Sequence, residues 1–109
     1  MAAAEDRRRT IAIVGGGPAG LMAAEVLAGA GLRVDVYDAM PSVARKFLLA
    51  GRGGLNLTHA EDRAIFVTRY GARRAEVCRW LDEFGPQQLR DWAHALGITT
   101  FVGSSGRVF

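Results

Sequence analysis

The first forty residues alternate between apolar runs and glycine breaks in the order of a strand, a helix and a second strand. Ile11–Val14 is an unbroken apolar run rich in β-branched residues, which is typical of a strand covered on both faces in a parallel sheet. Pro18 suits the first position of a helix, and the apolar residues after it recur at helical spacing until Gly29 and Gly31. Val34–Tyr37 then alternates as a second strand. The order predicts a βαβ unit with a right-handed crossover.

A loop-like segment, residues 39–59, follows this unit, because prolines and glycines interrupt any period there. Phe47–Leu49 is expected to form a helical turn inside it. Two amphipathic helices are predicted next, separated by Gly85-Pro86. Their apolar stripes consist of Val77, Trp80, Leu81 and Phe84 in the first helix and Leu89, Trp92, Ala93 and Leu96 in the second.

The carboxyl-terminal pattern is that of the start of a β-hairpin. Thr99–Val102 predicts a strand, Gly103–Gly106 a turn, and Arg107–Phe109 the beginning of another strand. The predicted fold class is therefore α/β: a Rossmann-like βαβ unit, then a helical segment and the start of a hairpin, together forming an incomplete domain. We divide the chain into residues 1–59, the βαβ unit with its glycine-rich loop, and residues 60–109, the helical segment and strand.

Composition narrows the classes of function. The 109 residues carry 14 Lys+Arg and 11 Asp+Glu, and 50% are hydrophobic, which excludes a disordered polyelectrolyte. The basic residues are scattered, so we expect no nucleic-acid partner. Glycines interrupt the apolar stretch Thr10–Leu32, which argues against a membrane span or a signal peptide. The lone Cys78 forbids an internal disulfide and fits a reducing, cytoplasmic compartment. It is most simply a small buried side chain.

A glycine motif carries the first chemical signal. Gly15, Gly17 and Gly20 lie between the predicted strand and helix, where they permit a tight turn, a close approach of pyrophosphate and close packing of the helix. Asp38 follows Gly20 by 18 positions, where a carboxylate can accept hydrogen bonds from ribose hydroxyls and would repel a 2′-phosphate. The motif predicts FAD or NAD rather than NADP. A glycine turn without ligand and a solvated loop acid are the alternatives.

The next segment distinguishes FAD from NAD. Residues 45–58 contain two adjacent cations and then a glycine-rich loop with Asn and Thr, which suits a long dianionic cofactor better than a plain NAD domain. This stretch, the Gly-Gly-Gly-Pro-Ala-Gly opening and residues 103–109 resemble the BaiN-type family of bacterial NAD(P)/FAD-dependent oxidoreductases over residues 10–109. Many members have Arg-Cys-Asn where this chain has Gly54-Leu55-Asn56. A thiol role near the flavin is therefore not expected here.

The resemblance assigns most of the candidate binding residues. It implies that the FAD pyrophosphate is held by Gly15, Gly17, Pro18, Ala19 and Gly20. It implies that Asp38 holds the adenosine ribose and that Arg45 and Lys46 lie near the phosphates or the adenosine. It also implies that Gly53, Gly54 and Asn56 let the chain pass close to the flavin side of the cofactor. No residue is assigned as catalytic, and no metal site is expected.

The expected function is that of the amino-terminal, FAD-binding part of a flavin-dependent oxidoreductase. The resemblance implies reduction of an unsaturated small molecule, with NAD(P)H as the electron donor. A non-catalytic flavin- or dinucleotide-binding module and an NAD-dependent dehydrogenase are the alternatives. His59 is either a proton donor near the flavin or an ordinary loop histidine, and His94 is expected at the surface. Residues 1–109 alone are expected to be inactive, and their uncovered apolar stripes would permit self-association.

Overall fold

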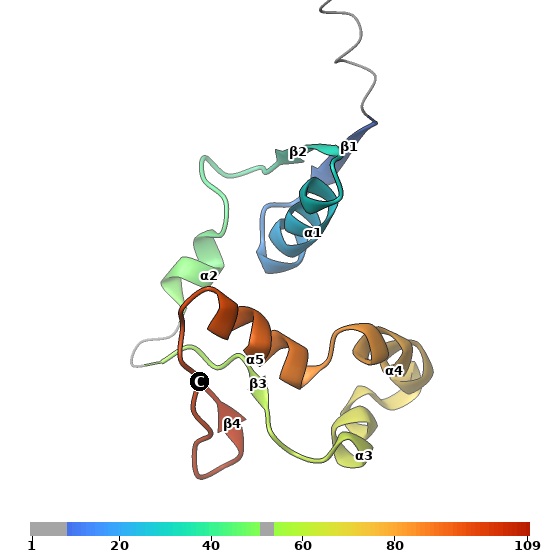
Figure 1. The fold of residues 1–109 in the computed structure, drawn as a ribbon, viewed down its shortest axis with the longest axis vertical. Helices are drawn as coiled ribbons and strands as arrows, with labels where there is room; N and C mark the ends of the chain where they lie inside the picture. Colours follow the sequence, from blue (N-terminus) through green and yellow to red (C-terminus); the bar gives the residue numbers. More distant parts are fainter. Residues whose placement is uncertain (1–8, 51–53) are drawn as a thin grey trace, which may run out of the picture. The chain divides into compact units, whose positions relative to one another are not determined.

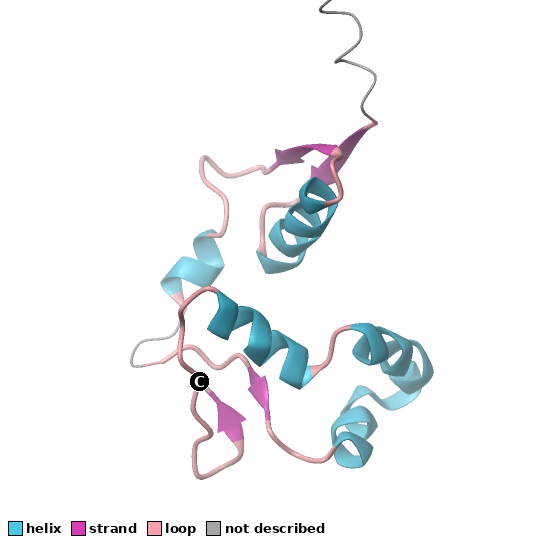
Figure 2. Ribbon diagram, viewed as in Figure 1, coloured by secondary structure: helices cyan, strands magenta, loops and turns pink. Residues whose placement is uncertain are grey.

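The computed structural model describes residues 9–50 and 54–109. Two compact units make up the chain, Met1–Gly51 and Arg52–Phe109. The first unit runs from blue to green in Figure 1, and the second from green to red. Helices and strands alternate in the first unit, whereas helices dominate the second (Figure 2).

The first unit is a βαβ arrangement, as predicted. Strand β1 (Thr10–Val14) pairs in parallel with β2 (Arg33–Tyr37), with Thr10 opposite Arg33 and Val14 opposite Tyr37. Helix α1 (Pro18–Gly29) connects them and lies along one face of the pair (Figure 1). Because the strands are parallel and in register, Val14 and Tyr37 end at the same edge of the sheet, next to the start of α1.

The segment after β2 forms the predicted helical turn. Helix α2 (Arg45–Leu49) includes Phe47–Leu49. The residue that precedes it, Ala44, has a left-handed backbone (φ 58°, ψ 24°). A left-handed alanine is strained by roughly 1–2 kcal/mol relative to the right-handed form. The surrounding contacts therefore hold this residue in place.

Helices form most of the second unit. They are α3 (Arg63–Phe66), the 3₁₀ segment η2 (Val67–Arg73), α4 (Arg74–Glu83) and α5 (Pro86–Ala95). The break between α4 and α5 at Gly85-Pro86 confirms the prediction, and the Gln88 Oε1 atom accepts the Gly85 N–H at 3.1 Å.

The helical turns of α3 and η2 were not anticipated from the sequence. Their residues show no sustained apolar stripe, and the backbone is non-helical at Gly71 (φ 53°, ψ −126°). A periodicity argument fails for helices of one or two turns, because too few residues sample the period.

A small antiparallel sheet closes the second unit. Strand β3 (Thr58–His59) pairs with β4 (Arg107–Val108), with Thr58 opposite Val108 and His59 opposite Arg107. The expected turn is present, since the Gly106 N–H donates to the Gly103 carbonyl at 3.0 Å. The start of a β-hairpin is therefore confirmed, and β3 is an additional strand that two residues of sequence could not reveal.

The predicted strand at Thr99–Val102 is confirmed only at its end, where it pairs with residues 107–109. Among the described residues only Val102 of this segment forms a bridge, with Val108, and Phe101 exchanges both backbone hydrogen bonds with Phe109 at 3.0 Å. Thr100 instead contacts α5 through its hydroxyl group, which lies 3.0 Å from Arg90 Nε and 2.8 Å from His94 Nε2. The strand pairing therefore begins at Phe101.

Few described side chains are fully buried. The buried apolar residues are Val67, Ala93 and Val108, and Val108 has no exposed surface. Trp80 is 67% exposed and Phe84 42% exposed, as expected for an apolar stripe without full cover. Cys78 is partly exposed rather than buried, and His94 is exposed as expected. No helix in residues 9–50 and 54–109 is long and apolar enough to cross a membrane.

The Glu61–Arg69 ion pair makes the second unit sensitive to acid. Arg69 donates two hydrogen bonds to the Glu61 carboxylate, at 2.6 and 2.7 Å, and this contact lowers the pKa of Glu61 below its usual value of 4.5. Because the folded-state pKa is depressed, the stabilisation is present above pH 4.5 and is lost as the pH falls through the lowered value.

We expect Glu61→Gln to remove part of the loss of stability on acidification. The measurement is thermal unfolding between pH 3 and pH 7, with Glu83→Gln as the control for removing an exposed carboxylate. Parallel pH profiles for the wild type and Glu61→Gln would contradict the role of this ion pair.

Candidate functional site

The turn between β1 and α1 presents the start of a helix to solvent. The Gly15 N–H donates to the Tyr37 carbonyl at 2.7 Å, and Gly15 has a positive φ of 110°, which a side chain rarely adopts. Gly17 precedes α1, and the first intrahelical bond runs from the Leu21 N–H to the Gly17 carbonyl at 2.9 Å. The N–H groups before Leu21 therefore have no acceptor within the helix, and the positive end of the helix dipole faces the same side. This arrangement suits an anion.

The glycines of this turn meet two different steric requirements. A Cβ atom on Gly20 would lie 1.9 Å from the Gly15 carbonyl oxygen and 3.3 Å from Ile13 Cγ2, so Gly20 is required for the packing of α1 on the turn. A Cβ atom on Gly17 would meet nothing within 4 Å, and the Gly17 backbone is ordinary (φ −82°, ψ −174°). Nothing in the described protein fills the space above Gly17, which is therefore available to a ligand.

Asp38 lies beside this turn at the end of β2. Its Oδ2 atom accepts the Gly16 N–H and its Oδ1 atom accepts the Met40 N–H, both at 2.8 Å. These two hydrogen bonds, from Met40 first and then Gly16, lower the pKa of Asp38 below its usual 3.8. The carboxylate is therefore ionised at neutral pH. Each oxygen keeps a lone pair, so contact with a ribose hydroxyl is compatible with both bonds.

A cavity of about 240 Å³ connects the glycine turn to the start of α2. The cavity lining brings together Gly17, Pro18 and Asp38 with Arg45 and Lys46, which the resemblance assigns to the phosphates and the adenosine. The cavity is smaller than the roughly 300–1,000 Å³ of pockets that enclose a drug-sized ligand, so it fits part of a dinucleotide. Its lining residues are Gly16, Gly17, Pro18, Asp38, Met40, Ser42, Ala44, Arg45, Lys46 and Phe47.

Other predicted residues lie outside this cavity lining. Gly15, Ala19 and Gly20 shape the turn without lining the cavity. Gly54 and Asn56 belong to the second unit. A Cβ atom on Gly54 would lie 3.5 Å from Phe109 Cδ1, and Asn56 lines a cavity of about 420 Å³ in that unit. Gly53 lies outside the described residues.

His59 has a structural position in the second unit. Its Nδ1 atom accepts the Glu61 N–H at 3.1 Å, so the proton resides on Nε2, which donates to the Ser105 carbonyl at 3.1 Å. A Cβ atom on Gly106 would lie 2.5 Å from His59 Cε1, so the ring packs directly against the turn. These contacts favour the ordinary loop histidine over the proton donor.

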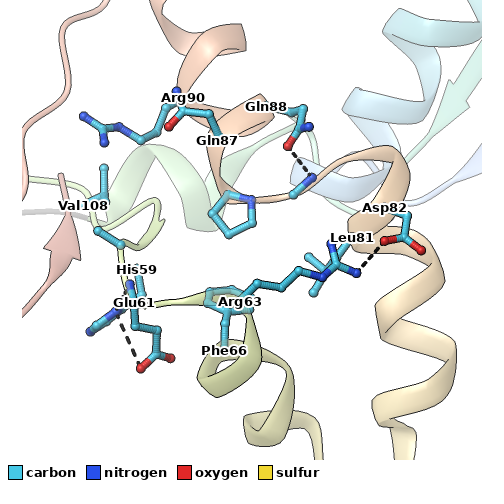
Figure 3. A pocket seen from close by; sticks show the side chains of 13 residues that line it. His59, Glu61, Arg63, Phe66, Leu81, Asp82, Gln87, Gln88, Arg90 and Val108 are labelled. Atoms are coloured by element: carbon cyan, nitrogen blue, oxygen red, sulfur yellow. Dashed lines mark hydrogen bonds and ion pairs between the residues drawn. The ribbon is translucent and has the colours of Figure 1, made fainter.

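A second hollow of about 430 Å³ lies among β3, α3, α4 and α5 (Figure 3). Figure 3 shows His59 and Glu61 at one side of this hollow, and the Arg63–Asp82 pair at another. The Arg63 Nη2 atom lies 2.5 Å from Asp82 Oδ1 and 3.1 Å from the Cys78 carbonyl. The Arg63 and Asp82 side chains therefore form hydrogen bonds within the second unit. The described residues contain no group of three or more His, Cys, Asp or Glu that could hold a metal.

Sequence reasoning missed the part that Gly16 and Val43 play in the site. A Cβ atom on Gly16 would lie 2.5 Å from Val43 Cγ1, and the Ala44 N–H donates to the Gly16 carbonyl at 2.7 Å. The run of three glycines was a signal for Gly16, because the fingerprint itself requires no glycine at its middle position. No local pattern marks Val43, since its role comes from a contact 27 residues away in the sequence.

The chain is similar to proteins of a known family. A family model described as the HI0933-like protein Rossmann domain matches residues 9–109, and this is a flavin-binding family of oxidoreductase type. UacF of Escherichia coli (strain K12), whose name describes it as a candidate oxidoreductase, is 49% identical over 37 residues. That match covers 34% of this chain and 6% of the length of UacF.

Proposed function

This chain belongs to the HI0933-like Rossmann domain family, and we propose that it is the FAD-binding part of a flavin-dependent oxidoreductase of the BaiN type. The observation that carries the proposal is the cavity in which the open face of Gly17, the ionised Asp38 and the cations Arg45 and Lys46 meet. Two positive side chains and a helix start complement a dianionic pyrophosphate.

The residues present fit such a cofactor. The space above Gly17 admits a phosphate group at the start of α1, because a Cβ atom there would meet nothing within 4 Å. Asp38 can accept a ribose hydroxyl, and its negative charge disfavours a 2′-phosphate. In this proposal Pro18 and Ala19 contribute the first turn of the helix.

The proposed reaction is reduction of an unsaturated small molecule with electrons from NADH or NADPH. The flavin supplies the hydride chemistry when it is bound, and the protein binds and orients it. The name of the relative UacF says only that it is an oxidoreductase. The electron acceptor and the nicotinamide preference are therefore part of the proposal.

The test is the absorption spectrum of the purified protein, followed by anaerobic addition of NADH or NADPH. We expect flavin absorbance in the visible range and its bleaching by one of the two nucleotides. Bound flavin that neither nucleotide reduces would favour a non-catalytic flavin-binding module. Absence of flavin together with tight binding of NAD would overturn the proposal in favour of an NAD-dependent dehydrogenase.

A further inference from the structure

Two hydrogen bonds join the glycine turn to the segment that follows β2. The Gly16 N–H donates to Asp38 Oδ2 at 2.8 Å, and the Gly16 carbonyl accepts the Ala44 N–H at 2.7 Å. Both backbone hydrogen-bonding groups of one loop residue are therefore engaged by residues 22 and 28 positions away. The middle glycine of the turn is the point of attachment.

Steric contact reinforces this attachment. Gly16 is buried, and a Cβ atom on it would lie 2.5 Å from Val43 Cγ1 and 2.9 Å from Val43 Cβ. Val43 thus packs directly over the Gly16 backbone. The left-handed Ala44 turns the chain so that α2 starts beside Gly17.

Asp38 accepts hydrogen bonds from the glycine turn and from the segment that follows β2. Its second oxygen accepts the Met40 N–H at 2.8 Å, which closes the turn leading to Val43 and Ala44. The same carboxylate therefore fixes the glycine turn and the segment that carries Arg45 and Lys46. Both hydrogen bonds join residues of the chain itself.

We propose that Asp38 is a positioning residue that holds the phosphate-binding turn in its binding conformation through Gly16, in addition to contacting the ribose. This inference rests on the proposed function only for the identity of the ligand. Preformed sites bind more tightly because less ordering accompanies binding. Loss of the Asp38 carboxylate therefore weakens binding even of a nucleotide that has no ribose hydroxyls to offer.

The first experiment measures amide hydrogen exchange at Gly16 in the flavin-free protein. We expect Asp38→Ala to accelerate this exchange at least about tenfold, because the N–H loses its acceptor. Asp35→Ala removes the same charge three positions earlier in β2 and should leave the Gly16 rate unchanged. Equal Gly16 rates in the wild type and Asp38→Ala would overturn the proposal, whether or not the protein binds FAD.

The second experiment titrates the flavin-free protein with FAD and with a synthetic FAD whose adenosine lacks the 2′ and 3′ hydroxyls. We expect Asp38→Ala to raise the Kd for FAD by roughly ten- to a hundredfold, the range for hydrogen bonds to a charged group. For the dideoxy analogue, a loss of at least about fivefold should remain, since preorganisation does not depend on the ribose. An unchanged Kd for the analogue would show that Asp38 acts on the ribose alone.

A compensating pair of substitutions keeps the proposal testable if Asp38→Ala does not fold. Gly16→Ala should weaken FAD binding, because its methyl group displaces Val43, and Val43→Gly should restore most of the affinity by removing the 2.5 and 2.9 Å contacts. If Gly16→Ala leaves the Kd for FAD unchanged, the attachment through Gly16 is wrong. If wild-type protein binds no FAD, the proposed function fails and the exchange experiment still decides this inference.

Discussion

Gly20→Ala is expected to lower the free energy of unfolding by about 3 kcal/mol, the upper part of the range for overpacking. Helix propensity alone predicts the opposite sign, because alanine is favoured over glycine in a helix interior by roughly 1 kcal/mol. The packing effect dominates, since the new Cβ atom would lie 1.9 Å from the Gly15 carbonyl oxygen. That oxygen belongs to the backbone and cannot rotate away as a side chain would.

Gly29→Ala provides the matched control. Gly29 ends the same helix, α1, and a Cβ atom on it would meet nothing within 4 Å. Propensity should therefore act alone there, and the substitution should leave stability unchanged or raise it by up to about 1 kcal/mol. Urea unfolding of the two variants, monitored by circular dichroism, measures both effects. Equal stability of Gly20→Ala and the wild type would show that α1 can move away from the turn at little energetic cost.

The length of each element decided whether it could be predicted from the sequence. The order of apolar runs and glycine breaks predicted β1, α1 and β2 because each element is long enough to show its period. The Gly85-Pro86 break between α4 and α5 was equally visible. The short elements β3, α3 and η2 left no such pattern. The strand expected at Thr99–Val102 pairs only from Phe101 onward, because the Thr100 side chain contacts α5 instead.

The candidate site was predictable to a similar depth. Motif spacing indicated that Gly17 and Asp38 share one region, and the family resemblance implied that Arg45 and Lys46 lie near it. The structure places these residues around one cavity. Sequence could not reveal that Asp38 also binds the Gly16 N–H, or that Val43 packs on Gly16. Both contacts join residues far apart in the chain, and they depend on how the segment after β2 folds back. A local pattern carries no information about such a return.

Gly17→Val should produce the converse of Gly20→Ala: a folded protein that has lost its cofactor. The Gly17 backbone is extended (φ −82°, ψ −174°), a conformation that any residue can adopt, and the space around its Cβ position is open. The cost to folding is limited to a poorer helix cap, about 1 kcal/mol. A branched side chain would occupy the space above the start of α1, where the pyrophosphate is proposed to lie.

We therefore expect Gly17→Val to raise the Kd for FAD at least about a hundredfold, equivalent to roughly 2.7 kcal/mol, while circular dichroism remains that of the wild type. Gly29→Val is the matched control, because it places the same side chain in open space on α1 away from the cavity lining. It should retain the wild-type Kd. Flavin content and a fluorescence titration with FAD measure the effect. Wild-type affinity in a folded Gly17→Val protein would mean that the pyrophosphate binds elsewhere, since a valine side chain at this position leaves no room for a phosphate against the helix start.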